Sequence, residues 1–415
     1  MLSEIITIGD ELLIGQVVNT NSAWLAEALN GIGISVVQIT TVSDQRQAII
    51  NAIDQAALRA DLILMTGGLG PTRDDITKHT LIEYFGGKLV RNDEALEMIK
   101  EFLTSRGVEQ SELNLGQALV PDNCTVIPNR WGTAPGMWFR KDGRDFISMP
   151  GVPYEMKGMM TGFILPELRK KHNLPVIIHR TIVTQGIPES HLARLLKEYE
   201  DTLSGEVKLA YLPSPGTVRL RLSLTGDDKN KTEVTMNYEV ERLLKIVSEY
   251  VVNTEDEKLE KTVGELLYKK GKTLSLAESC TGGMIAHLIT SVPGSSRYLT
   301  GSIVAYSNEI KEKILGVRKE SLESYGAVSE QVVRGMASGA LKLFGTDYSI
   351  ATSGIAGPDG GTSEKPVGMV WISVASGNQV WAEKFLFGNM RDTNILKASM
   401  TALNMLRKLI MYENS

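Results

Sequence analysis

Cysteine, positive charge and long apolar runs are all scarce in this 415-residue sequence. The two cysteines, Cys124 and Cys280, lie far apart, which argues against a disulfide framework and for a reducing compartment. No Cys/His cluster has the spacing of a zinc site. The formal net charge of −5 gives no overall basic surface for nucleic acid. Neither a signal peptide nor a run of about 20 apolar residues is evident, so we expect a cytoplasmic protein.

What is present is typical of a globular protein with several domains. Hydrophobic residues make up 42% of the sequence and charged residues 22%. A chain of this length is too long for one ordinary core, so two to four domains are expected. Strands alternate with helices in the first and third domains, which predicts α/β domains, and the lack of polar alternation in the first predicts a parallel sheet covered on both faces. A polar helical excursion is expected between residues 90 and 122, and a hairpin from residues 367–387. A half-exposed strand of period two at 218–225 predicts a small α+β unit in the middle. Breaks in the pattern place the domains at residues 1–170, 171–253 and 254–415.

The first domain contains a glycine-rich segment at the end of an apolar strand. Residues 61–65 form the predicted strand, and residues 66–77 follow it with the sequence TGGLGPTRDDIT. Ligands of open α/β sheets bind at the carboxyl ends of strands, where glycine lets backbone amides approach a phosphate. The spacing is not that of a Walker P-loop. Four acids could meet at this edge and hold a divalent metal, or could merely cap helices: Asp10, Glu11, Asp74 and Asp75.

The densest set of chemically useful residues lies between residues 275 and 311. A Ser/Thr/Gly-rich turn joins the predicted strand at 274–276 to a predicted helix at 284–289. We expect the helix start to offer free backbone N–H groups to an anion. A second loop of the same kind, residues 353–361, follows the predicted strand at 348–352. The two loops together predict a site for a phosphorylated ligand.

Hydroxyl groups and a lysine in the same stretch predict nucleophilic catalysis. A lysine whose pKa is lowered by burial can take the proton of a serine in place of histidine. The alternative is that these residues only cap helices and form turns. Cys280 is interpreted as a small packing residue. The candidates for the reaction are Ser279, Ser295, Ser296, Tyr306 and Lys311.

Six motifs in this region resemble the nicotinamide-nucleotide amidohydrolase domain of the CinA family. They read ESCTGG from Glu278, GSS from Gly294, YSN from Tyr306, Lys311 alone, GAVS from Gly326 and SGIAGP from Ser353. The resemblance implies hydrolysis of nicotinamide mononucleotide to nicotinate mononucleotide and ammonia, without a cofactor.

The resemblance also implies a role for each matched residue in the reaction. Lys311 would take the proton of Ser296, which would attack the nicotinamide carbonyl, and Tyr306 would relay or orient the proton. Ser279 stays open as the alternative nucleophile. The residues implied in substrate binding are Thr281, Gly282, Gly354, Ala356, Gly357 and Arg391.

The first 170 residues resemble the molybdopterin-binding fold as it occurs at the N-terminus of CinA proteins. The shared motifs include GDELL from Gly9, NTN from Asn19, the segment 66–77 and MPGVPYEM from Met149. The resemblance implies hydrolysis of ADP-ribose to AMP and ribose 5-phosphate with Mg²⁺, Mn²⁺ or Co²⁺, and K⁺ as a further candidate. Asp74 and Asp75 are the first choices for the metal, before Asp10 and Glu11. The implied substrate-binding residues are Asn21, Gly67, Gly68, Gly70 and Thr72.

The middle segment resembles the KH-like connecting domain of the same family. It lacks the Gly-x-x-Gly loop of nucleic-acid-binding KH modules, so we interpret it as a spacer and contact domain. The resemblance further implies a homodimer acting on small nucleotides, with no membrane partner. Two other classes stay open: a pterin- or nucleotide-binding scaffold without catalysis, and an accessory protein for DNA uptake or repair.

Overall fold

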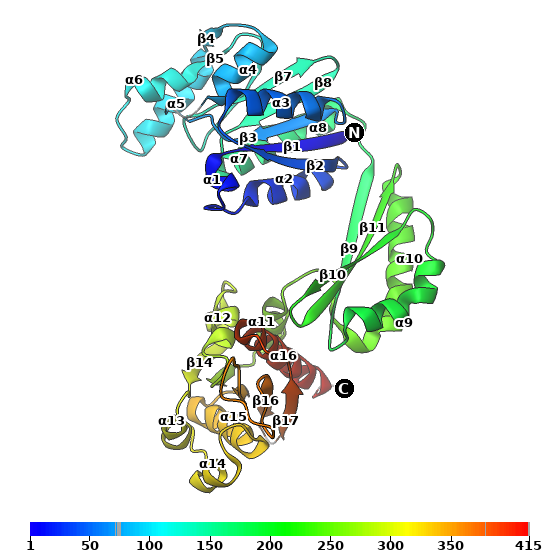
Figure 1. Ribbon diagram of the computed structural model, residues 1–415, viewed down its shortest axis with the longest axis vertical. Coiled ribbons are helices and arrows are strands. Elements are labelled where there is room, and N and C mark those ends of the chain that lie inside the picture. The colour runs from blue at the N-terminus through cyan, green and yellow to red at the C-terminus, as the bar shows by residue number, and fades with distance from the viewer. Residues whose placement is uncertain (71, 73–75, 378, 414–415) are drawn as a thin grey trace. The chain divides into compact units, whose positions relative to one another are not determined.

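The computed structural model describes residues 1–70, 72, 76–377 and 379–413 (Figure 1). It divides into two compact units, one of residues 1–178 with 224–235 and the other of residues 179–223 with 236–415. Both units contain mixed α/β structure, in agreement with the predicted fold class. No described helix is long and apolar enough to cross a membrane.

The N-terminal sheet has the strand order β2-β1-β3-β8-β7-β6. Its first four strands are parallel, and the last two continue it antiparallel. The apolar strand predicted at 61–65 is β3, which is buried along its whole length because helices cover both faces of the sheet. The strands are β1 (Leu2–Ile8), β2 (Ser35–Val42), β3 (Leu62–Thr66), β6 (Thr125–Ile127), β7 (Gly136–Lys141) and β8 (Arg144–Met149).

Two apolar cores cover the faces of this sheet. Ile5 on β1 packs into one core with Leu25 and Met156, and its neighbour Ile6 packs into the other with Ile49. Successive strand residues point to opposite faces, so the unbroken apolar pattern is what two covered faces require. The covering elements are α2 (Thr20–Asn30), α7 (Pro153–Met159), the π-helix η2 (Met160–Ile164) and α8 (Leu165–Lys171) on one side, and α3 (Arg46–Ala57) and α4 (Thr77–Phe85) on the other.

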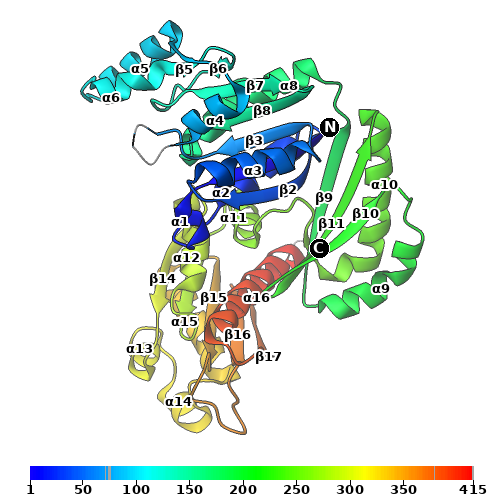
Figure 2. The same ribbon diagram turned by 45° about the horizontal axis from the view of Figure 1, so that its top comes forward.

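The predicted polar excursion between residues 90 and 122 is a small subdomain with its own core. Ala95, Ile99 and Leu103 of one helix pack on Ala118. This part is drawn in cyan at the edge of the N-terminal unit in Figure 2. Its elements are β4 (Leu89–Arg91), α5 (Asp93–Ser105), α6 (Glu112–Leu115), η1 (Gly116–Ala118) and β5 (Leu119–Pro121). A separate short helix, α1 (Asp10–Leu13), follows β1.

The middle segment forms a four-stranded sheet in the order β10-β11-β9-β12, with two helices. The half-exposed strand predicted at 218–225 is β11, whose burial alternates along the strand. The elements are β9 (Val176–Gln185), α9 (Glu189–Asp201), β10 (Lys208–Ser214), β11 (Thr217–Gly226), α10 (Lys229–Val247), η3 (Ser248–Tyr250) and β12 (Val251–Asn253).

The C-terminal sheet has the order β14-β13-β15-β16-β17. The first three strands are parallel, and β16 and β17 form the hairpin predicted from residues 367–387. The strands are β13 (Leu274–Glu278), β14 (Leu299–Val304), β15 (Tyr348–Gly354), β16 (Met369–Ser376) and β17 (Gln379–Leu386).

Helices cover both faces of this sheet too. Leu267, Ile285 and Leu406 belong to the core on one face, and Val333 and Met336 to the core on the other. The helices are α11 (Leu259–Lys269), α12 (Met284–Thr290), η4 (Ser295–Arg297), α13 (Asn308–Lys313), α14 (Lys319–Tyr325), α15 (Glu330–Phe344) and α16 (Arg391–Tyr412). Because β13, β14 and β15 are parallel, the loops that follow them meet at one edge of the sheet.

Candidate active site

A buried lysine meets a serine at the carboxyl edge of the C-terminal sheet. Ser279 directly follows β13, and Lys311 lies on α13, which comes after β14. Lys311 Nζ lies 3.1 Å from Ser279 Oγ, 2.7 Å from the Ala305 carbonyl oxygen and 3.1 Å from the Tyr306 carbonyl oxygen. The exposed fractions are only 1% for Lys311 and 8% for Ser279. The structure therefore brings together two of the predicted catalytic residues.

The surroundings of Lys311 fit an uncharged amine. Burial lowers the pKa of Lys311 from its ordinary value, because a buried ammonium loses its hydration. Within the described residues it forms no ion pair with a carboxylate. A neutral amine has two N–H donors and one lone pair, which match two carbonyl acceptors and the hydroxyl of Ser279. In the charged form Lys311 donates to Ser279 Oγ; in the neutral form its lone pair would face the proton of Ser279.

Ser296, predicted to react with Lys311, lies at the opposite edge of the sheet. It is an exposed residue of η4, which precedes β14, whereas Lys311 follows β14. Leu299 at the start of β14 pairs with Leu274, and Val304 at its end pairs with Glu278. A six-residue strand spans roughly 20 Å. The predicted pairing of Lys311 with Ser296 is therefore corrected to the alternative, Ser279.

Tyr306 contacts the site differently from the predicted proton relay. Its carbonyl oxygen accepts from Lys311, but its hydroxyl is bonded to Arg391, at 3.2 Å from Nη2. Arg391 Nη1 also donates to the Gly357 carbonyl oxygen at 2.8 Å. Arg391 thus joins the segment after β14 to the loop after β15, and it is an exposed residue.

The predicted anion site at the start of α12 is occupied by the protein itself. The carboxylate of Glu278 accepts from the backbone N–H groups of Gly283 (3.0 Å), Ile285 (3.1 Å) and Ala286 (2.9 Å). A negative side chain there satisfies N–H groups that the helix leaves unpaired. The expectation that these N–H groups are free for a ligand is wrong for these three.

The turn between Glu278 and α12 holds two predicted binding residues. Thr281 is buried, and its hydroxyl lies 2.7 Å from the hydroxyl of Thr352 on β15. Gly282 and Gly283 have φ angles of 61° and 98°, a region that favours glycine. Thr281 therefore ties the turn to β15. Its role in substrate binding stays a prediction. Thr352 was not singled out from the sequence, although a polar residue in an apolar strand beside a glycine loop is a usable signal.

The second predicted loop begins at Gly354, the last residue of β15. Ala356 offers its carbonyl oxygen to Asn394 Nδ2 at 3.0 Å, and Asn394 also bonds the backbone N–H and C=O of Gly388. Gly357, with φ 92°, carries the carbonyl bonded by Arg391. Sequence reasoning missed Asn394, because a polar residue three positions after Arg391 on a helix gives no signal of its own.

The N-terminal candidates gather at the carboxyl edge of β1 and β3. Asn21 donates to the Gly151 carbonyl oxygen at 2.7 Å, and its buried Oδ1 has no hydrogen-bond partner within the described residues. It lines a cavity of about 110 Å³ together with Glu11 and Thr66. A Cβ on Gly67 would lie 2.1 Å from the Ile8 carbonyl oxygen. Only glycine permits this approach of the loop to β1.

The remaining N-terminal candidates are placed in part. Gly68 has φ 63°, and a Cβ there would lie 2.2 Å from Thr77 Oγ1. Gly70 and Thr72 belong to the described residues of the same loop, whereas Asp74 and Asp75 lie outside them. Asp10 and Glu11 form the first turn of α1. No group of three metal-ligating side chains occurs within the described ranges. The described residues alone do not compose a metal site.

Fold and site define a class: a chain of α/β domains whose C-terminal sheet carries a buried serine–lysine pair. Three family models match successive parts of the chain: "Probable molybdopterin binding domain" at residues 4–170, "Damage-inducible protein CinA KH domain" at 179–252 and "CinA C-terminal domain" at 256–410. The CinA-like protein of Cytophaga hutchinsonii is 46% identical over 406 residues, which are 98% of this chain and 97% of that one. The chain belongs to the CinA family.

A second relative agrees with this assignment. The CinA-like protein of Chloroherpeton thalassium is 44% identical over 418 residues and covers 99% of both chains. Among solved structures, the competence/damage inducible protein CihA of Agrobacterium tumefaciens is 39% identical and covers 36% of this chain and 93% of its own, with a TM-score of 0.36.

Proposed function

We propose that the C-terminal domain is an amidohydrolase that converts nicotinamide mononucleotide to nicotinate mononucleotide and ammonia. The observation that carries this proposal is the contact of 3.1 Å between Lys311 Nζ and Ser279 Oγ inside a buried site. A lysine kept neutral by burial can activate a serine for attack on a carboxamide. Membership of the CinA family supports the same activity.

Two half-reactions follow from this geometry. Lys311 takes the Ser279 proton as Oγ bonds to the carboxamide carbon. The resulting ammonium returns the proton to the leaving nitrogen as the C–N bond breaks, so ammonia departs and an ester remains on Ser279. Water, deprotonated by Lys311, then attacks the ester carbon. As the bond from that carbon to Ser279 Oγ breaks, Lys311 returns the proton to Oγ, and nicotinate mononucleotide is released. The backbone N–H groups of Cys280 and Thr281 bond no backbone carbonyl oxygen of the described residues, and they are our candidates for holding the oxyanion.

Arg391 is the side chain best placed to recognise the substrate phosphate. Arg391 is an exposed residue, and within the described part of the chain its guanidinium bonds the Tyr306 hydroxyl and the Gly357 carbonyl oxygen, which are both neutral. Guanidinium groups bind phosphate through paired N–H donors. Since Glu278 occupies the start of α12, we assign the phosphate to Arg391 and the loop from Gly354 to Gly357.

Ammonia release from nicotinamide mononucleotide by the full-length protein tests the proposal. Ser279→Ala and Lys311→Ala should each abolish release, because each removes one half of the reacting pair. Ser296→Ala is the matched control: it deletes the same hydroxyl at the opposite edge of the sheet and should leave release unchanged. A folded wild type that releases no ammonia would sink the assignment. Loss of release in the Ser296 variant with retention in the Ser279 variant would reverse the choice of nucleophile.

For the N-terminal domain we propose hydrolysis of ADP-ribose to AMP and ribose 5-phosphate. The observation in its favour is the cavity at the carboxyl edge of β1 and β3, with the unpartnered buried Oδ1 of Asn21 among its lining side chains. A divalent metal held by Asp74 and Asp75, with Asp10 and Glu11 as further ligands, would neutralise phosphoryl charge when bound. Binding of a pterin at the same edge is the competing proposal.

AMP formation from ADP-ribose, with and without Mg²⁺, Mn²⁺ or Co²⁺, tests this second activity. Asp74→Asn and Asp75→Asn should each lower turnover, and Asn21→Ala should raise KM. Metal-independent turnover, or none with any of the three ions, would contradict the proposal. The cytoplasmic location and the homodimer stay proposals, and a monomeric mass by light scattering would refute the latter.

A further inference from the structure

Glu278 is a wholly buried carboxylate beside the proposed nucleophile. Its exposed fraction is 0%, and within the described residues it forms no ion pair. Three backbone N–H groups are its partners, those of Gly283, Ile285 and Ala286. A buried carboxylate without a basic partner is costly unless hydrogen bonds replace its hydration. Glu278 therefore depends on these amides, and they depend on it.

The backbone of Glu278 is fixed on its other side by the sheet. Its carbonyl oxygen accepts from the Ala305 N–H at 2.7 Å, and Ser279, the next residue, donates its N–H to the Thr352 carbonyl oxygen at 3.0 Å. The Ala305 carbonyl oxygen in turn accepts from Lys311. One short stretch of backbone thus connects the Glu278 carboxylate, the Ser279 hydroxyl and the Lys311 amine.

The turn that carries Ser279 is held by two backbone hydrogen bonds, from Gly282 N–H to the Ser279 carbonyl oxygen (3.1 Å) and from Met284 N–H to the Thr281 carbonyl oxygen (3.0 Å). The Thr281 hydroxyl ties it to β15 as well. Two of the turn's five residues, Gly282 and Gly283, are glycines with positive φ, and glycine has the greatest conformational freedom of any residue. The Glu278 carboxylate closes this turn, because it joins the end of β13 to the start of α12. The same bonds fix the direction in which Ser279 Oγ leaves the sheet.

We propose that Glu278 is a positioning residue that holds Ser279 Oγ against Lys311 Nζ by closing the turn of residues 279–283. The inference rests on the proposed amidohydrolase function. Displacement of a reacting atom by about 1 Å costs on the order of a hundredfold in rate. We therefore expect removal of the carboxylate to lower kcat about a hundredfold with little change in KM, because Arg391 and the 354–357 loop still bind the substrate.

Glu278→Gln is the sharpest variant for this test. The amide keeps the size of the side chain, and its one oxygen can replace Oε2, which accepts from Gly283 and Ile285. Its NH₂ group then faces the Ala286 N–H, where Oε1 now accepts, and two donors repel each other. Glu260→Gln is the matched control, since Glu260 is a buried glutamate at the start of α11 in the same domain. The control should retain kcat and KM.

Folding is measured separately from catalysis. Circular dichroism and thermal unfolding of each variant give the folded fraction, to which kcat is normalised. If Glu278→Gln does not fold, Glu278→Asp takes its place: it keeps the charge but is one methylene too short for all three amides. The same fall in kcat is expected.

A fluorophosphonate probe separates this inference from the substrate assignment. Ser279 Oγ would bond to phosphorus with loss of fluoride and transfer of its proton to Lys311, and the rate of labelling follows from intact mass. Labelling of the wild type at Ser279, slowed about a hundredfold in Glu278→Gln, would support positioning even if nicotinamide mononucleotide is not the substrate. Folded Glu278→Gln with wild-type labelling rate or wild-type kcat would overturn the inference and leave the amidohydrolase proposal standing.

Discussion

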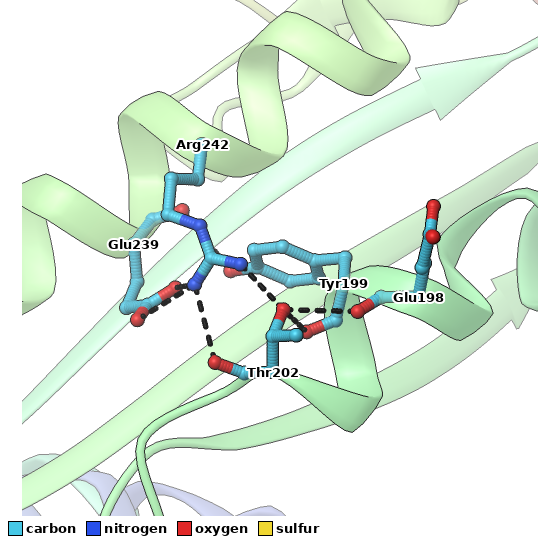
Figure 3. A network of polar contacts seen from close by, with 5 residues as sticks. All are labelled: Glu198, Tyr199, Thr202, Glu239 and Arg242. Carbon is cyan, nitrogen blue, oxygen red and sulfur yellow. Dashed lines mark hydrogen bonds and ion pairs between the residues drawn. The ribbon is translucent and has the colours of Figure 1, made fainter.

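Two basic side chains of the second unit have opposite surroundings. Arg242 on α10 lies beside the carboxylate of Glu239, with Nη1 at 2.8 Å and 3.1 Å from its two oxygens (Figure 3). Lys311 on α13 is bonded to a hydroxyl and two carbonyl oxygens, and to no carboxylate of the described residues. A cation that meets its countercharge stays charged and stabilises the fold, whereas a buried lysine without one can give up its proton.

The neighbouring sequence does not reveal this difference. Glu309 and Glu312 lie within two residues of Lys311, yet Glu309 pairs with Lys313 at 2.7 Å on the exposed side of α13. Glu239 and Arg242, by contrast, are three residues apart on one face of α10, where they meet directly. The direction of the side chain, and not the nearness of acids in the sequence, decides which cation is neutralised.

The largest expected effect comes from replacing Lys311 with arginine, the type of residue found at position 242. Lys311→Arg keeps a long basic side chain but cannot act as a proton acceptor, because guanidinium stays protonated. We expect ammonia release to fall at least about a thousandfold, as general-base catalysis contributes up to about 10⁴-fold. Steady-state ammonia assays check this. Lys313→Arg, on the same helix and exposed, is the control and should leave ammonia release unchanged. Substantial activity in Lys311→Arg would show that the residue acts as a cation and not as a base.

A smaller effect should follow when Lys311 is given the countercharge that Arg242 has. Cys280 is a buried residue directly after Ser279, and burial raises the pKa of its thiol to about 12, so the thiol is neutral. Cys280→Asp would place a carboxylate there and raise the pKa of Lys311, because an opposite charge favours the ammonium.

The sign of the pH effect follows from the role of Lys311 as a base. Only the neutral amine accepts a proton, so activity rises with pH through the pKa of Lys311. A raised pKa moves the acidic limb of the kcat/KM profile to higher pH, and at a fixed pH below that limb activity falls about tenfold for each pH unit that the limb moves. Cys280→Ser, with a neutral group, should keep the wild-type profile. An unshifted limb in folded Cys280→Asp would show that Lys311 does not govern this limb.

The sequence predicts much of the framework of this site. Apolar strands ending in glycine-rich loops identified the carboxyl edges of β3, β13 and β15, and the motif around Ser279 and Lys311 identified two residues that do meet. The predicted pairing of Ser296 with Lys311 does not occur in the structure, for a reason that strand direction could have supplied: Ser296 precedes β14 and Lys311 follows it. A residue just before a strand and a residue just after it lie at opposite edges of the sheet, so they cannot meet.

Other features depend on three-dimensional packing and have no local signal. Glu278 could not be recognised as an internal cap, because its role needs the tight glycine turn that returns α12 to it. The π-helix η2 interrupts a continuous helical pattern, and β12 has only three residues, paired to β9. Such short pairings are set by tertiary contacts and not by residue preference.

Substitution of Arg242 should have the smallest effect on catalysis but should clearly lower the stability of the fold. Its guanidinium also donates to the hydroxyl of Thr202 at 2.6 Å, and Tyr199 donates its hydroxyl to the Glu239 carbonyl oxygen at 3.0 Å (Figure 3). Arg242→Met would leave Glu239, whose side chain is 3% exposed, without its partner. Breaking a buried pair costs about 3 kcal/mol or more, and the 27% exposure of Arg242 places the loss at the lower end.

Urea unfolding followed by circular dichroism measures this loss, with ammonia release per folded molecule measured in parallel. Arg242→Lys retains a charge for Glu239 but lacks the second nitrogen that reaches Thr202, so a loss of about 1 kcal/mol is expected. Both variants should keep the wild-type kcat, since Arg242 touches no residue of the serine–lysine site. Equal stability of Arg242→Met and wild type would show that water replaces the guanidinium. A changed kcat in a fully folded variant would contradict the conclusion that Arg242 stabilises the fold and takes no part in catalysis, in contrast to Lys311.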